Sequence, residues 1–288
     1  MRILLTGRNG QVGWELERKL APLGEVIATD RASLDLTDPD AIRCLVREAK
    51  PEVIVNAAAY TAVDKAESEP ELAIQINSFA PGVLAEEAKR LGALLVHYST
   101  DYVFDGEKAT PYVEDDPPSP LNVYGRSKLE GERAIQASGC RHLILRTSWV
   151  YGARGNNFLL TILRLAKERD ELHVVEDQVG APTWCCPLAE ATAAILPRAV
   201  LGETSAPGLY HLTNGGRTSW YGFAAEILRL ANIATPVRAV TAAEHAARAA
   251  RPASSLLDNA KLRKVFGIAM PDWRASLAAC LRSFAGGV

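Results

Sequence analysis

The amino-acid sequence predicts an α/β fold of the Rossmann type, in which a doubly wound parallel sheet is followed by a smaller C-terminal lobe. Short β-rich runs alternate with longer helical patterns over residues 1–175, which is typical of parallel strands joined by helices on both faces of a sheet. A glycine-rich loop follows the first β-rich run directly. Beyond residue 175 the elements become shorter and are separated by Gly and Pro. We therefore expect one domain over 1–175 and a lobe over 176–288, with a soft boundary.

Each predicted strand of the first domain ends in small or polar residues. The β-rich runs are RILLT, EVIATD, VIVNAAA, ALLVHYST and HLILRTSWV, and a sixth strand is expected before residue 175. Helical periodicity separates the runs and continues over Tyr124–Ala137 and from Asn157 onward. Helices are expected in the lobe over Pro187–Arg198, Trp220–Ala231 and Trp273–Phe284. The run LYHLT also has the pattern of a strand that returns to the main sheet.

Composition and charge exclude several classes of function. Of 288 residues 48% are hydrophobic, which is enough for a proper core. The 32 basic and 34 acidic residues give a net charge of -2 without long runs, so we expect neither a nucleic-acid partner nor a polybasic membrane anchor. The sequence has no signal-peptide pattern and no run of 18 apolar residues, which predicts a cytoplasmic protein. The five cysteines lack metal-type spacing and are expected to be reduced thiols.

The loop after the first strand carries Gly7, Gly10 and Gly13 in G-x-x-G-x-x-G spacing, and a helical pattern follows without a gap. A pyrophosphate needs a tight turn, a backbone that it can approach closely and the N-terminus of a helix. The alternative is a plain strand-to-helix turn. Because strand, glycines and helix occur together, we expect this loop to bind a dinucleotide.

Two adjacent residues favour different nicotinamide cofactors. Asp30 ends the second strand, where a carboxylate hydrogen-bonds the ribose hydroxyls of NAD. Arg31 follows it, and a guanidinium there stacks on adenine or pairs with the 2′-phosphate of NADP. We therefore expect that both NADH and NADPH are used. The alternative for Asp30 is a carboxylate that caps its own loop.

Further residues should meet the dinucleotide at the carboxyl edge of the sheet. Asp35 and Leu36 follow the second strand, and Ala57, Ala58 and Ala59 end the third. Small side chains at a strand end let a ligand approach the backbone. The alternative for the alanine run is ordinary core packing.

A tyrosine and a lysine lie four residues apart in NVYGRSKLEGERAI, a stretch with helical periodicity. This spacing places Tyr124 and Lys128 on one face of a helix, one turn apart. A tyrosine hydroxyl titrates at about 10, and a neighbouring ammonium lowers that pKa by stabilising the phenolate. We therefore expect an acid–base pair, with a mere exposed helix pair as the alternative.

The strand ALLVHYST delivers Ser99, Thr100 and Asp101 to the edge of the sheet that the glycine loop occupies. A hydroxyl at Thr100 is able to hydrogen-bond a substrate carbonyl and to share its developing charge with Tyr124. The alternative is that Ser99 and Thr100 only cap the turn that follows.

These features resemble those of the extended short-chain dehydrogenases/reductases. Longer strings are similar to the dTDP-4-dehydrorhamnose reductase family within that group. They are GQVGWEL, VNAAAYTAVDKAESEPELA, VHYSTDYVFDG, SPLNVYGRSKLEGE, RTSWVYG, NNFLLTILRLAKER and DQVGAPT. The likeness spans essentially the whole chain and weakens over Pro197–Gly208 and Ala234–Arg251.

The resemblance implies that NADPH or NADH reduces the C4 ketone of dTDP-4-dehydro-6-deoxy-L-mannose to dTDP-L-rhamnose, the final step of dTDP-rhamnose biosynthesis. Tyr124 would protonate the C4 oxygen, Lys128 would hold the nicotinamide ribose and tune Tyr124, and Thr100 would polarise the carbonyl. Asp101 and Trp149 would contact the sugar. The residues implied to line the cofactor are Gly10, Gln11, Val12, Asp30, Asp35, Leu36, Ala59, Tyr60, Thr61 and Tyr98.

The C-terminal lobe is the expected cover of the sugar nucleotide. Arg251 opens the polar segment RPASSLLD and is our expected contact for the diphosphate, with a plain surface arginine as the alternative. Trp149 ends the strand HLILRTSWV and offers a flat apolar face to the C6 methyl group of a 6-deoxysugar. Ordinary core packing is the alternative for Trp149.

One departure from the family concerns a metal ion. In members with Mg²⁺ at a dimer interface an acidic residue follows the GAPT string, whereas Trp184, Cys185 and Cys186 follow it here. Glu15 alone makes a poor site for a hard cation. We therefore do not expect a metal, while a homodimer stays open.

Two rival functions remain at this point. One is a catalytically silent regulatory subunit with the same fold. The other is a related sugar-nucleotide epimerase or epimerase/reductase, which needs an additional acid–base residue near the sugar. His97, His173 and His211 are available, but each lies in an apolar strand pattern, and we expect them to be structural.

Overall fold

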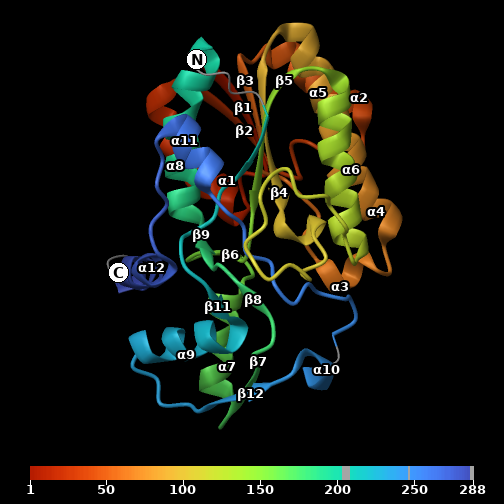
Figure 1. Ribbon diagram of the computed structural model, residues 1–288. Coiled ribbons are helices and arrows are strands. Elements are labelled where there is room, and N and C mark those ends of the chain that lie inside the picture. Colours follow the sequence, from red (N-terminus) through yellow and green to blue (C-terminus); the bar gives the residue numbers. More distant parts are fainter. Residues whose placement is uncertain (203–207, 246, 286–288) are drawn as a thin grey trace.

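A six-stranded parallel sheet forms the centre of the computed structural model, which describes residues 1–202, 208–245 and 247–285. Its strands follow the order β10-β5-β4-β3-β1-β2 (Figure 1). Their bounds are β1 Arg2–Thr6, β2 Glu25–Thr29, β3 Val53–Asn56, β4 Leu94–Thr100, β5 Arg141–Thr147 and β10 Gly208–His211. Every residue of β3 and β4 is buried, as expected for parallel strands covered on both faces. The predicted Rossmann-type α/β fold is confirmed.

The order of the strands creates a switch point between β1 and β3. The chain passes from β1 outward to β2 and then returns across β1 to β3, from which it proceeds in the opposite direction. Ligands of such sheets bind at the carboxyl ends of the strands beside this point. The register sets Thr6 of β1 opposite Asn56 of β3, and Asn56 opposite His97 of β4.

Two layers of helices cover the sheet (Figure 1). The helices on one face are α1 Gln11–Leu20, α8 Cys185–Leu201 and α11 Ala260–Phe266. Those on the other face are α2 Pro39–Ala49, α5 Ala80–Leu91 and α6 Val123–Ser138. Two of these helices have a side-chain N-cap. Asn122 accepts a hydrogen bond from Gly125 N at the start of α6, and Asp38 accepts one from Asp40 N at the start of α2. Each layer of helices packs its own apolar cluster against one face of the sheet. The carboxyl ends of the strands are therefore supported from both faces.

Short elements complete the main domain. They are α3 Val63–Ala66, α4 Pro70–Ile74, the 3-10 helices η1 Ala21–Leu23 and η3 Asp101–Val103, and the π-helical turn η2 Gln75–Phe79. The π-turn lies against α6, where a Cβ added at Gly131 would come within 2.1 Å of Asn77 O. Glycine at this position therefore lets the two helices approach closely.

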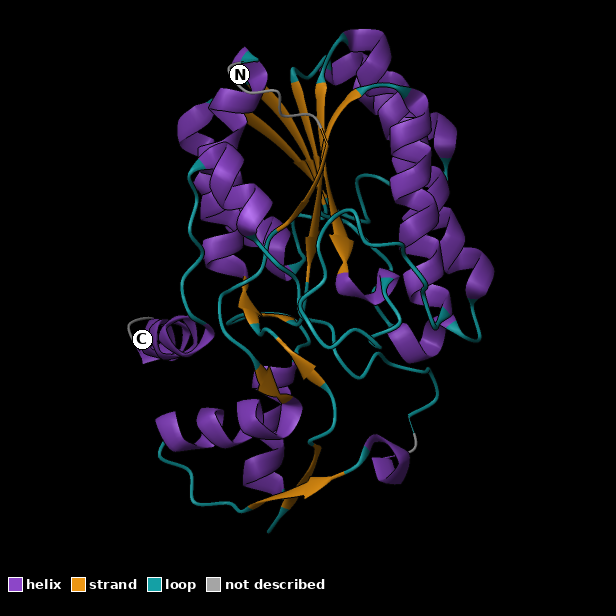
Figure 2. Cartoon of the chain, in the orientation of Figure 1, coloured by secondary structure: helices purple, strands orange, loops and turns teal. Residues whose placement is uncertain are grey.

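A lobe of short strand pairs and three longer helices lies beyond the carboxyl ends of the sheet (Figure 2). Its elements are α7 Phe158–Glu168, α9 Trp220–Leu230, α10 Ala242–His245, α12 Trp273–Ala285, β6 Val150–Tyr151, β7 Leu172–Val175, β8 Val179–Gly180, β9 Thr183–Trp184, β11 Thr218–Ser219 and β12 Val237–Val240. The pairs are β6 with β9, β7 with β12 and β8 with β11.

The elements are not divided between the two regions at a single point of the chain. Helix α7 and strand β7 precede residue 175, yet they share one apolar cluster with α9 and α12. Helix α8 and strand β10 follow residue 175, yet they pack with the main sheet. The sixth sheet strand is β10, so our expectation that it lies before residue 175 is wrong, because β7 pairs with β12 instead. We propose that the lobe consists of residues from both sides of the expected boundary.

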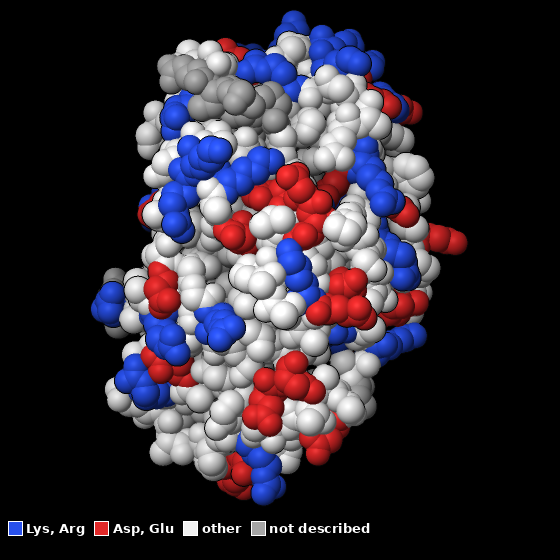
Figure 3. Space-filling view, in the orientation of Figure 1, with Lys and Arg blue, Asp and Glu red and all other residues white. Residues whose placement is uncertain are grey.

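Surface charge is mixed on the face that Figure 3 shows, with basic and acidic side chains interspersed among uncharged ones. None of the described helices is long and apolar enough to cross a bilayer.

Candidate active site

The loop between β1 and α1 has the geometry of a phosphate cradle. Gly7 adopts a φ of +78°, and a Cβ added there would lie 2.8 Å from the backbone of Ala58. A Cβ at Gly13 would lie 2.0 Å from Gly7 O. Gly10 precedes α1, and no side chain caps this helix end. Gly7 and Gly13 have no room for a side chain, and the first-turn N–H groups of α1 are available to an anion.

Two other predicted cofactor residues, Gln11 and Val12, begin helix α1. Gln11 donates from Nε2 to Val150 O at 3.5 Å and accepts from Asn157 Nδ2 at 3.0 Å. Val12 packs against the sheet core. The Gln11 side chain therefore ties the glycine loop to the segment that follows β6.

The loop after β2 holds Asp30 in place by hydrogen bonds of its own. The carboxylate accepts from Asn9 Nδ2 at 3.0 Å, from Ala32 N at 3.0 Å and from Ser33 N at 3.1 Å. The bond from Ser33 contributes most to holding the pKa of Asp30 below its usual value. Asp30 thus caps its loop, and this arrangement also orients it beside the exposed Arg31.

Asp35 and Leu36 follow in the same loop. Asp35 is exposed and accepts hydrogen bonds from the backbone and hydroxyl of Thr37, which lower its pKa. Leu36 is partly buried against the apolar cluster beneath α2 and α5.

Asn77 of the π-turn fixes the loop that follows β3. Its side chain accepts from Tyr60 N at 2.9 Å and donates to Tyr60 O and to Ser127 Oγ, each at 3.0 Å. Tyr60 donates its hydroxyl to Glu69 at 2.7 Å, and Thr61 next to it is exposed. The run of Ala57, Ala58 and Ala59 before this loop is partly buried, with Ala58 against the glycine loop.

The side chain of Tyr98 lies in the core of the main domain. Its ring belongs to the core beneath α1 and α8, and its hydroxyl hydrogen-bonds Thr192 Oγ1 of α8 at 2.6 Å. Successive side chains of a strand point to opposite faces, so Tyr98 faces away from α6. Its backbone carbonyl, in contrast, accepts a hydrogen bond from Lys128.

Tyr124, Lys128 and Thr100 meet at the carboxyl end of β4. Tyr124 and Lys128 lie one turn apart on α6, and the Thr100 hydroxyl lies close enough to the Tyr124 hydroxyl to influence its pKa. Thr100 also donates to Asp101 Oδ1 at 3.0 Å and accepts from Tyr102 N at 3.2 Å. The trio that the sequence predicts is thus brought to one place, and Thr100 caps the following turn at the same time.

The pKa of Tyr124 differs from the expectation. Desolvation raises the pKa of Tyr124 to about 12, although the neighbouring Thr100 hydroxyl opposes the shift. Burial lowers the pKa of Lys128 to about 7, and its Nζ lies 2.6 Å from Tyr98 O and 3.1 Å from His97 Nε2. Our expectation that Lys128 lowers the pKa of Tyr124 is therefore wrong for this arrangement, because the amine is engaged by β4 and its charge is suppressed.

Asp101 is a buried acid beside the trio, with 2% of its surface exposed. Burial raises the pKa of Asp101 to about 7, although hydrogen bonds from Ser255 and Thr100 oppose the shift. Ser255 comes from the segment that crosses the site from the C-terminal side, where Ser255 N donates to Val179 O at 2.9 Å. Asp101 therefore joins the sheet edge to its cover.

Trp149 does not present two free faces. Its ring stacks on Trp220 at 3.4 Å between centroids and 6° between planes, and Gly180 lies against the indole. Trp149 adopts a φ of +47°. This backbone conformation is rare for a bulky residue and is found mostly at functional sites. Our expectation of an open flat face at this strand end requires correction, because the lobe packs on the ring. The ring stays partly exposed.

Arg251 is already paired. Its Nη2 donates to Asp64 Oδ2 at 2.6 Å and its Nη1 to Ala249 O at 3.2 Å. It also interacts with Tyr102, whose ring meets that of Tyr124 edge-on at 5.8 Å. Arg251 is thus neither a lone surface arginine nor a free cation, because α3 supplies its counter-charge.

The three histidines that are candidates for the additional acid–base residue of an epimerase lie in different places. His97 is buried beneath Lys128. His211 is buried beside Phe104, and burial together with Arg146 lowers its pKa to about 3. His173 is exposed in the lobe and pairs with Glu171 at 3.0 Å.

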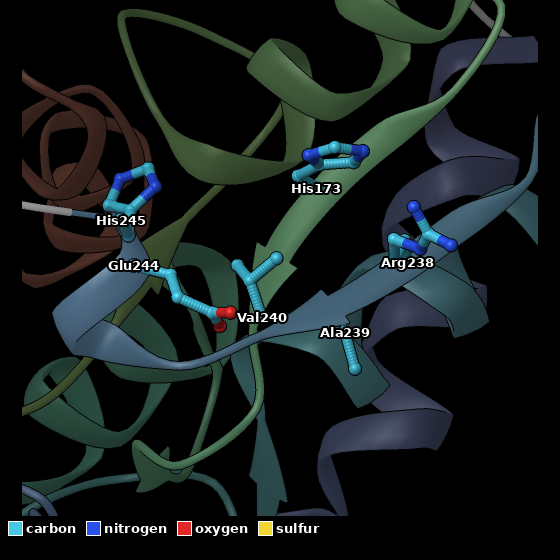
Figure 4. A pocket seen from close by; sticks show the side chains of 6 residues that line it. All are labelled: His173, Arg238, Ala239, Val240, Glu244 and His245. Atoms are coloured by element: carbon cyan, nitrogen blue, oxygen red, sulfur yellow. The ribbon is translucent and has the colours of Figure 1, made fainter.

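The hollow around His173 lies away from the catalytic trio. Figure 4 shows that its lining comes from β7, β12 and α10. It measures about 540 Å³ and is lined by His173, Arg238, Ala239, Val240, Glu244 and His245. Glu244 is engaged by its own helix start, where it accepts from Thr241 N at 2.7 Å.

No group of three or more His, Cys, Asp or Glu side chains in the described part of the chain could hold a metal ion. Cys185 is buried and its thiol pKa is raised by burial, while Cys186 approaches Glu190 at 3.6 Å. Trp184 packs at the rim of the apolar cluster of the lobe.

Sequence reasoning did not identify the residues that support the trio. They are the buried polar side chains of Asn56, Asn77 and Ser127. Asn56 hydrogen-bonds His97, which is next to Lys128, and Asn77 hydrogen-bonds Ser127 and the loop after β3. Their signal in the sequence is a polar residue inside an otherwise apolar strand or helix face. That signal alone does not say which partner each residue meets.

The fold and this site define an oxidoreductase of the short-chain dehydrogenase/reductase class. The model of one protein family, described as RmlD substrate binding domain, matches residues 1–285. The chain belongs to this family, that of the dTDP-4-dehydrorhamnose reductases.

Three relatives illustrate the likeness. A dTDP-4-dehydrorhamnose reductase of Burkholderia thailandensis is 50% identical over 293 residues, covering 98% of each chain. The crystal structure of a dTDP-4-dehydrorhamnose reductase from Clostridium acetobutylicum is 42% identical with a TM-score of 0.94, covering 99% of this chain and 100% of the other. That of the Bacillus anthracis enzyme in complex with NADP is 39% identical with a TM-score of 0.91, covering 98% and 99%.

Proposed function

We propose that this enzyme reduces the C4 ketone of dTDP-4-dehydro-6-deoxy-L-mannose with NADPH or NADH and releases dTDP-L-rhamnose. The observation that carries the proposal is the meeting of Thr100, Tyr124 and Lys128 at the edge of the sheet beside the glycine loop. The relatives named as dTDP-4-dehydrorhamnose reductases support the choice of substrate.

The residues of the glycine loop fit a nicotinamide dinucleotide. The close approach of Gly7 to Ala58 and of Gly13 to Gly7 leaves room for backbone but not for side chains. The uncapped start of α1 suits the pyrophosphate. NADP in the Bacillus anthracis structure supports the same class of cofactor here. Asp30 would bind ribose hydroxyls and Arg31 a 2′-phosphate, which supports use of both forms.

The chemistry follows from the protonation states of the site. A bound nicotinamide supplies the hydride that adds to C4. Tyr124 donates its hydroxyl proton to the C4 oxygen, for which it must enter the reaction as the phenol, the form that its raised pKa favours. Thr100 hydrogen-bonds the same oxygen and shares the developing charge. Lys128 would hold the nicotinamide ribose.

Asp101, Trp149 and Arg251 are the proposed contacts of the sugar nucleotide. Asp101 lies next to Thr100 and would accept from a sugar hydroxyl. The exposed part of Trp149 would meet the C6 methyl group. Arg251 would exchange part of its pairing with Asp64 for the diphosphate.

The rival functions find less support. A silent subunit has no need of the complete trio. An epimerase needs a second acid–base group at the sugar, whereas His97 lies beneath Lys128 and His173 is remote in the lobe.

A coupled assay tests the proposal. The protein is added to dTDP-glucose, its 4,6-dehydratase and the 3,5-epimerase, and loss of NADPH absorbance is followed together with the sugar nucleotide formed. We expect oxidation of NADPH that depends on all components, with dTDP-L-rhamnose as product. NADPH that stays constant while the keto sugar accumulates would contradict the proposal.

A further inference from the structure

The connection between β6 and α7, residues 152–157, lies against the helix that begins at the glycine loop. Gly155 adopts a φ of +74°, and a Cβ added there would touch Gln11 Cγ at 3.4 Å. A Cβ added at Gly152 would lie 2.5 Å from Cys185 Sγ of α8. The connection then continues into α7, which packs in the apolar cluster of the lobe. It therefore links the main domain to the lobe.

Asn157 makes the central contacts of this connection. It is 8% exposed, and its Oδ1 accepts a hydrogen bond from Leu160 N at 3.1 Å, which caps α7. Its Nδ2 lies 3.0 Å from each of three acceptors, which are Gly152 O, Arg154 O and Gln11 Oε1. The backbone partners fix the orientation of the amide, because an N–H only donates and a carbonyl oxygen only accepts. Asn157 therefore donates across to the first residue of α1.

A second contact joins the connection to α1. The guanidinium of Arg154 lies over the ring of Trp14, 3.6 Å from its centroid. Trp14 belongs to the first turn of α1, where its N–H donates to Gly10 O at 2.9 Å. Arg154 is exposed, and a cation–π contact at an exposed site is weak. The buried hydrogen bond from Asn157 is therefore the main link to α1.

On the lobe side, the first residue of α7 packs on the proposed cover of the sugar. The ring of Phe158 lies 4.6 Å from that of Trp220, and Trp220 stacks on Trp149 at 3.4 Å. Trp149 is the proposed surface for the C6 methyl group. A continuous set of contacts thus leads from the proposed pyrophosphate site at α1, through Asn157, to the proposed sugar site.

We propose that Asn157 is a positioning residue that couples the cofactor loop to the lobe, so that binding of the nicotinamide dinucleotide orders the lobe for the sugar nucleotide. The inference rests on the proposed function for this second ligand. The pyrophosphate is expected at the first-turn N–H groups of α1, one of which belongs to Gln11. A ligand there restrains the residue that accepts from Asn157, so that the second ligand has less ordering to bring about. By linkage, each ligand strengthens the other by the same factor.

A helix cap alone is the competing explanation for Asn157. Ser219 caps α9 of the same lobe by accepting from Gly222 N at 3.0 Å, so a hydroxyl is sufficient for a cap. Asn157→Ser therefore keeps an acceptor for α7 and removes the amide that donates to Gln11. This variant separates the cap from the link.

Hydrogen exchange followed by mass spectrometry tests the link with NADPH alone. In the unmodified protein we expect saturating NADPH to slow exchange in α1 and also in the first turn of α7, where Leu160 N and Thr161 N are bonded to Asn157. In Asn157→Ser the slowing should persist in α1 and be lost in α7. Equal slowing of α7 in both proteins, or none in the unmodified protein, would overturn the proposal.

Ser219→Ala is the matched control, because it removes a cap from the lobe at a different helix. NADPH should still slow exchange in α7 of this variant, and loss of the effect there would reduce the role of Asn157 to stability of the lobe. If Asn157→Ser does not fold, Gln11→Met removes the same bond from the side of α1. Slowing of α7 that survives in Gln11→Met would contradict the proposal equally.

Cooperative binding provides the closing measurement. The Kd of NADPH is determined by fluorescence with and without saturating dTDP-L-rhamnose, whose C4 is already reduced, so that no turnover occurs. We expect the sugar nucleotide to lower this Kd about fivefold in the unmodified protein and by less than about twofold in Asn157→Ser. An equal factor in the two proteins would overturn the coupling. Failure of dTDP-L-rhamnose to bind would instead contradict the proposed function, and the exchange result with NADPH alone then decides the role of Asn157.

Discussion

The carboxyl edge of the sheet and the lobe that covers it are held by different kinds of interaction. At the edge, Lys128 and its partners on β4 are buried and joined by hydrogen bonds as short as 2.6 Å. In the lobe, the elements nearest the site are held by the stacked rings of Trp149 and Trp220 and by the half-exposed pair of Arg251 with Asp64.

The two kinds of interaction suit two different tasks, which are positioning for proton transfer and binding of the substrate. Buried hydrogen bonds have steep requirements for distance and angle, so they fix the atoms that transfer a proton. Stacked rings and a partly solvated ion pair tolerate small shifts, which suits the proposed surface for a sugar nucleotide. Substitutions at the edge should therefore act on kcat, and those in the cover chiefly on KM.

The largest effect is expected at Tyr124. In Tyr124→Phe the ring still packs but the proton is gone, so kcat should fall by roughly 10² to 10⁴ with nearly unchanged affinity for NADPH. Steady-state kinetics and cofactor titration by fluorescence measure the two quantities. Activity within threefold of the unmodified enzyme would remove Tyr124 from the mechanism.

Asp101 should make the free energy of unfolding depend on pH. Its pKa in the fold, about 7, lies above the ordinary 3.8, so the protonated form contributes stability that is present below pH 4 and is lost as the pH rises to 7. Asp101→Asn imitates the protonated acid. We expect it to be more stable than the unmodified enzyme by about 2–4 kcal/mol at pH 8 and by little at pH 4.

Urea unfolding at the two pH values provides the measurement for Asp101. Equal stability differences at pH 4 and pH 8 would show that burial does not raise the pKa of this carboxyl. The same variant should also bind the sugar nucleotide more weakly.

Lys128→Met tests the proposed contact between Lys128 and the nicotinamide ribose. Because the Lys128 amine is proposed both to act with Tyr124 and to hold the nicotinamide ribose, we expect kcat/KM to fall by about 10² and the affinity for NADPH to weaken as well. A variant with normal cofactor affinity would contradict the ribose contact. Methionine has a similar length, so the packing of α6 on β4 is retained.

The cover should respond more mildly. Trp149→Ala removes the proposed surface for the C6 methyl group, and we expect KM for the keto sugar to rise about tenfold while NADPH affinity is unchanged. Trp220→Ala, which removes only the stacking partner, should raise KM less. If Trp149→Ala is folded and has normal KM, the sugar lies elsewhere.

The smallest effect concerns cofactor choice. Asp30→Ala removes a carboxylate that binds ribose hydroxyls and repels a 2′-phosphate, so the ratio of kcat/KM for NADPH over NADH should rise by about three- to tenfold. Its hydrogen bonds from Asn9 of the glycine loop and from Ala32 and Ser33 of its own loop also disappear. An unaltered ratio would indicate that Asp30 serves only as a cap.

The sequence predicted the features that depend on local pattern. The glycine spacing, the strand rhythm and the helical interval from Tyr124 to Lys128 each follow from one short stretch, and the family resemblance supplied the substrate. The site residues that these patterns indicate come together at the edge.

What could not be predicted depends on register and on distant partners. The row of Thr6, Asn56 and His97 exists only because three strands pair in one register. The pairing of Arg251 with Asp64 and the stacking of Trp149 on Trp220 join segments far apart in sequence. No local periodicity records such contacts, so the partners of Arg251 and Trp149 could not be predicted from the sequence.

Transfer of an isotope tests the central account most directly. The purified keto sugar nucleotide is reduced with NADPH that carries deuterium on C4 of the nicotinamide, prepared in each of its two stereochemical forms, and the product is examined by NMR and mass spectrometry. We predict dTDP-L-rhamnose with one deuterium at C4 of the sugar from one of the two forms and none from the other. NADPH that is not consumed, or deuterium at another carbon of the sugar, would contradict the account.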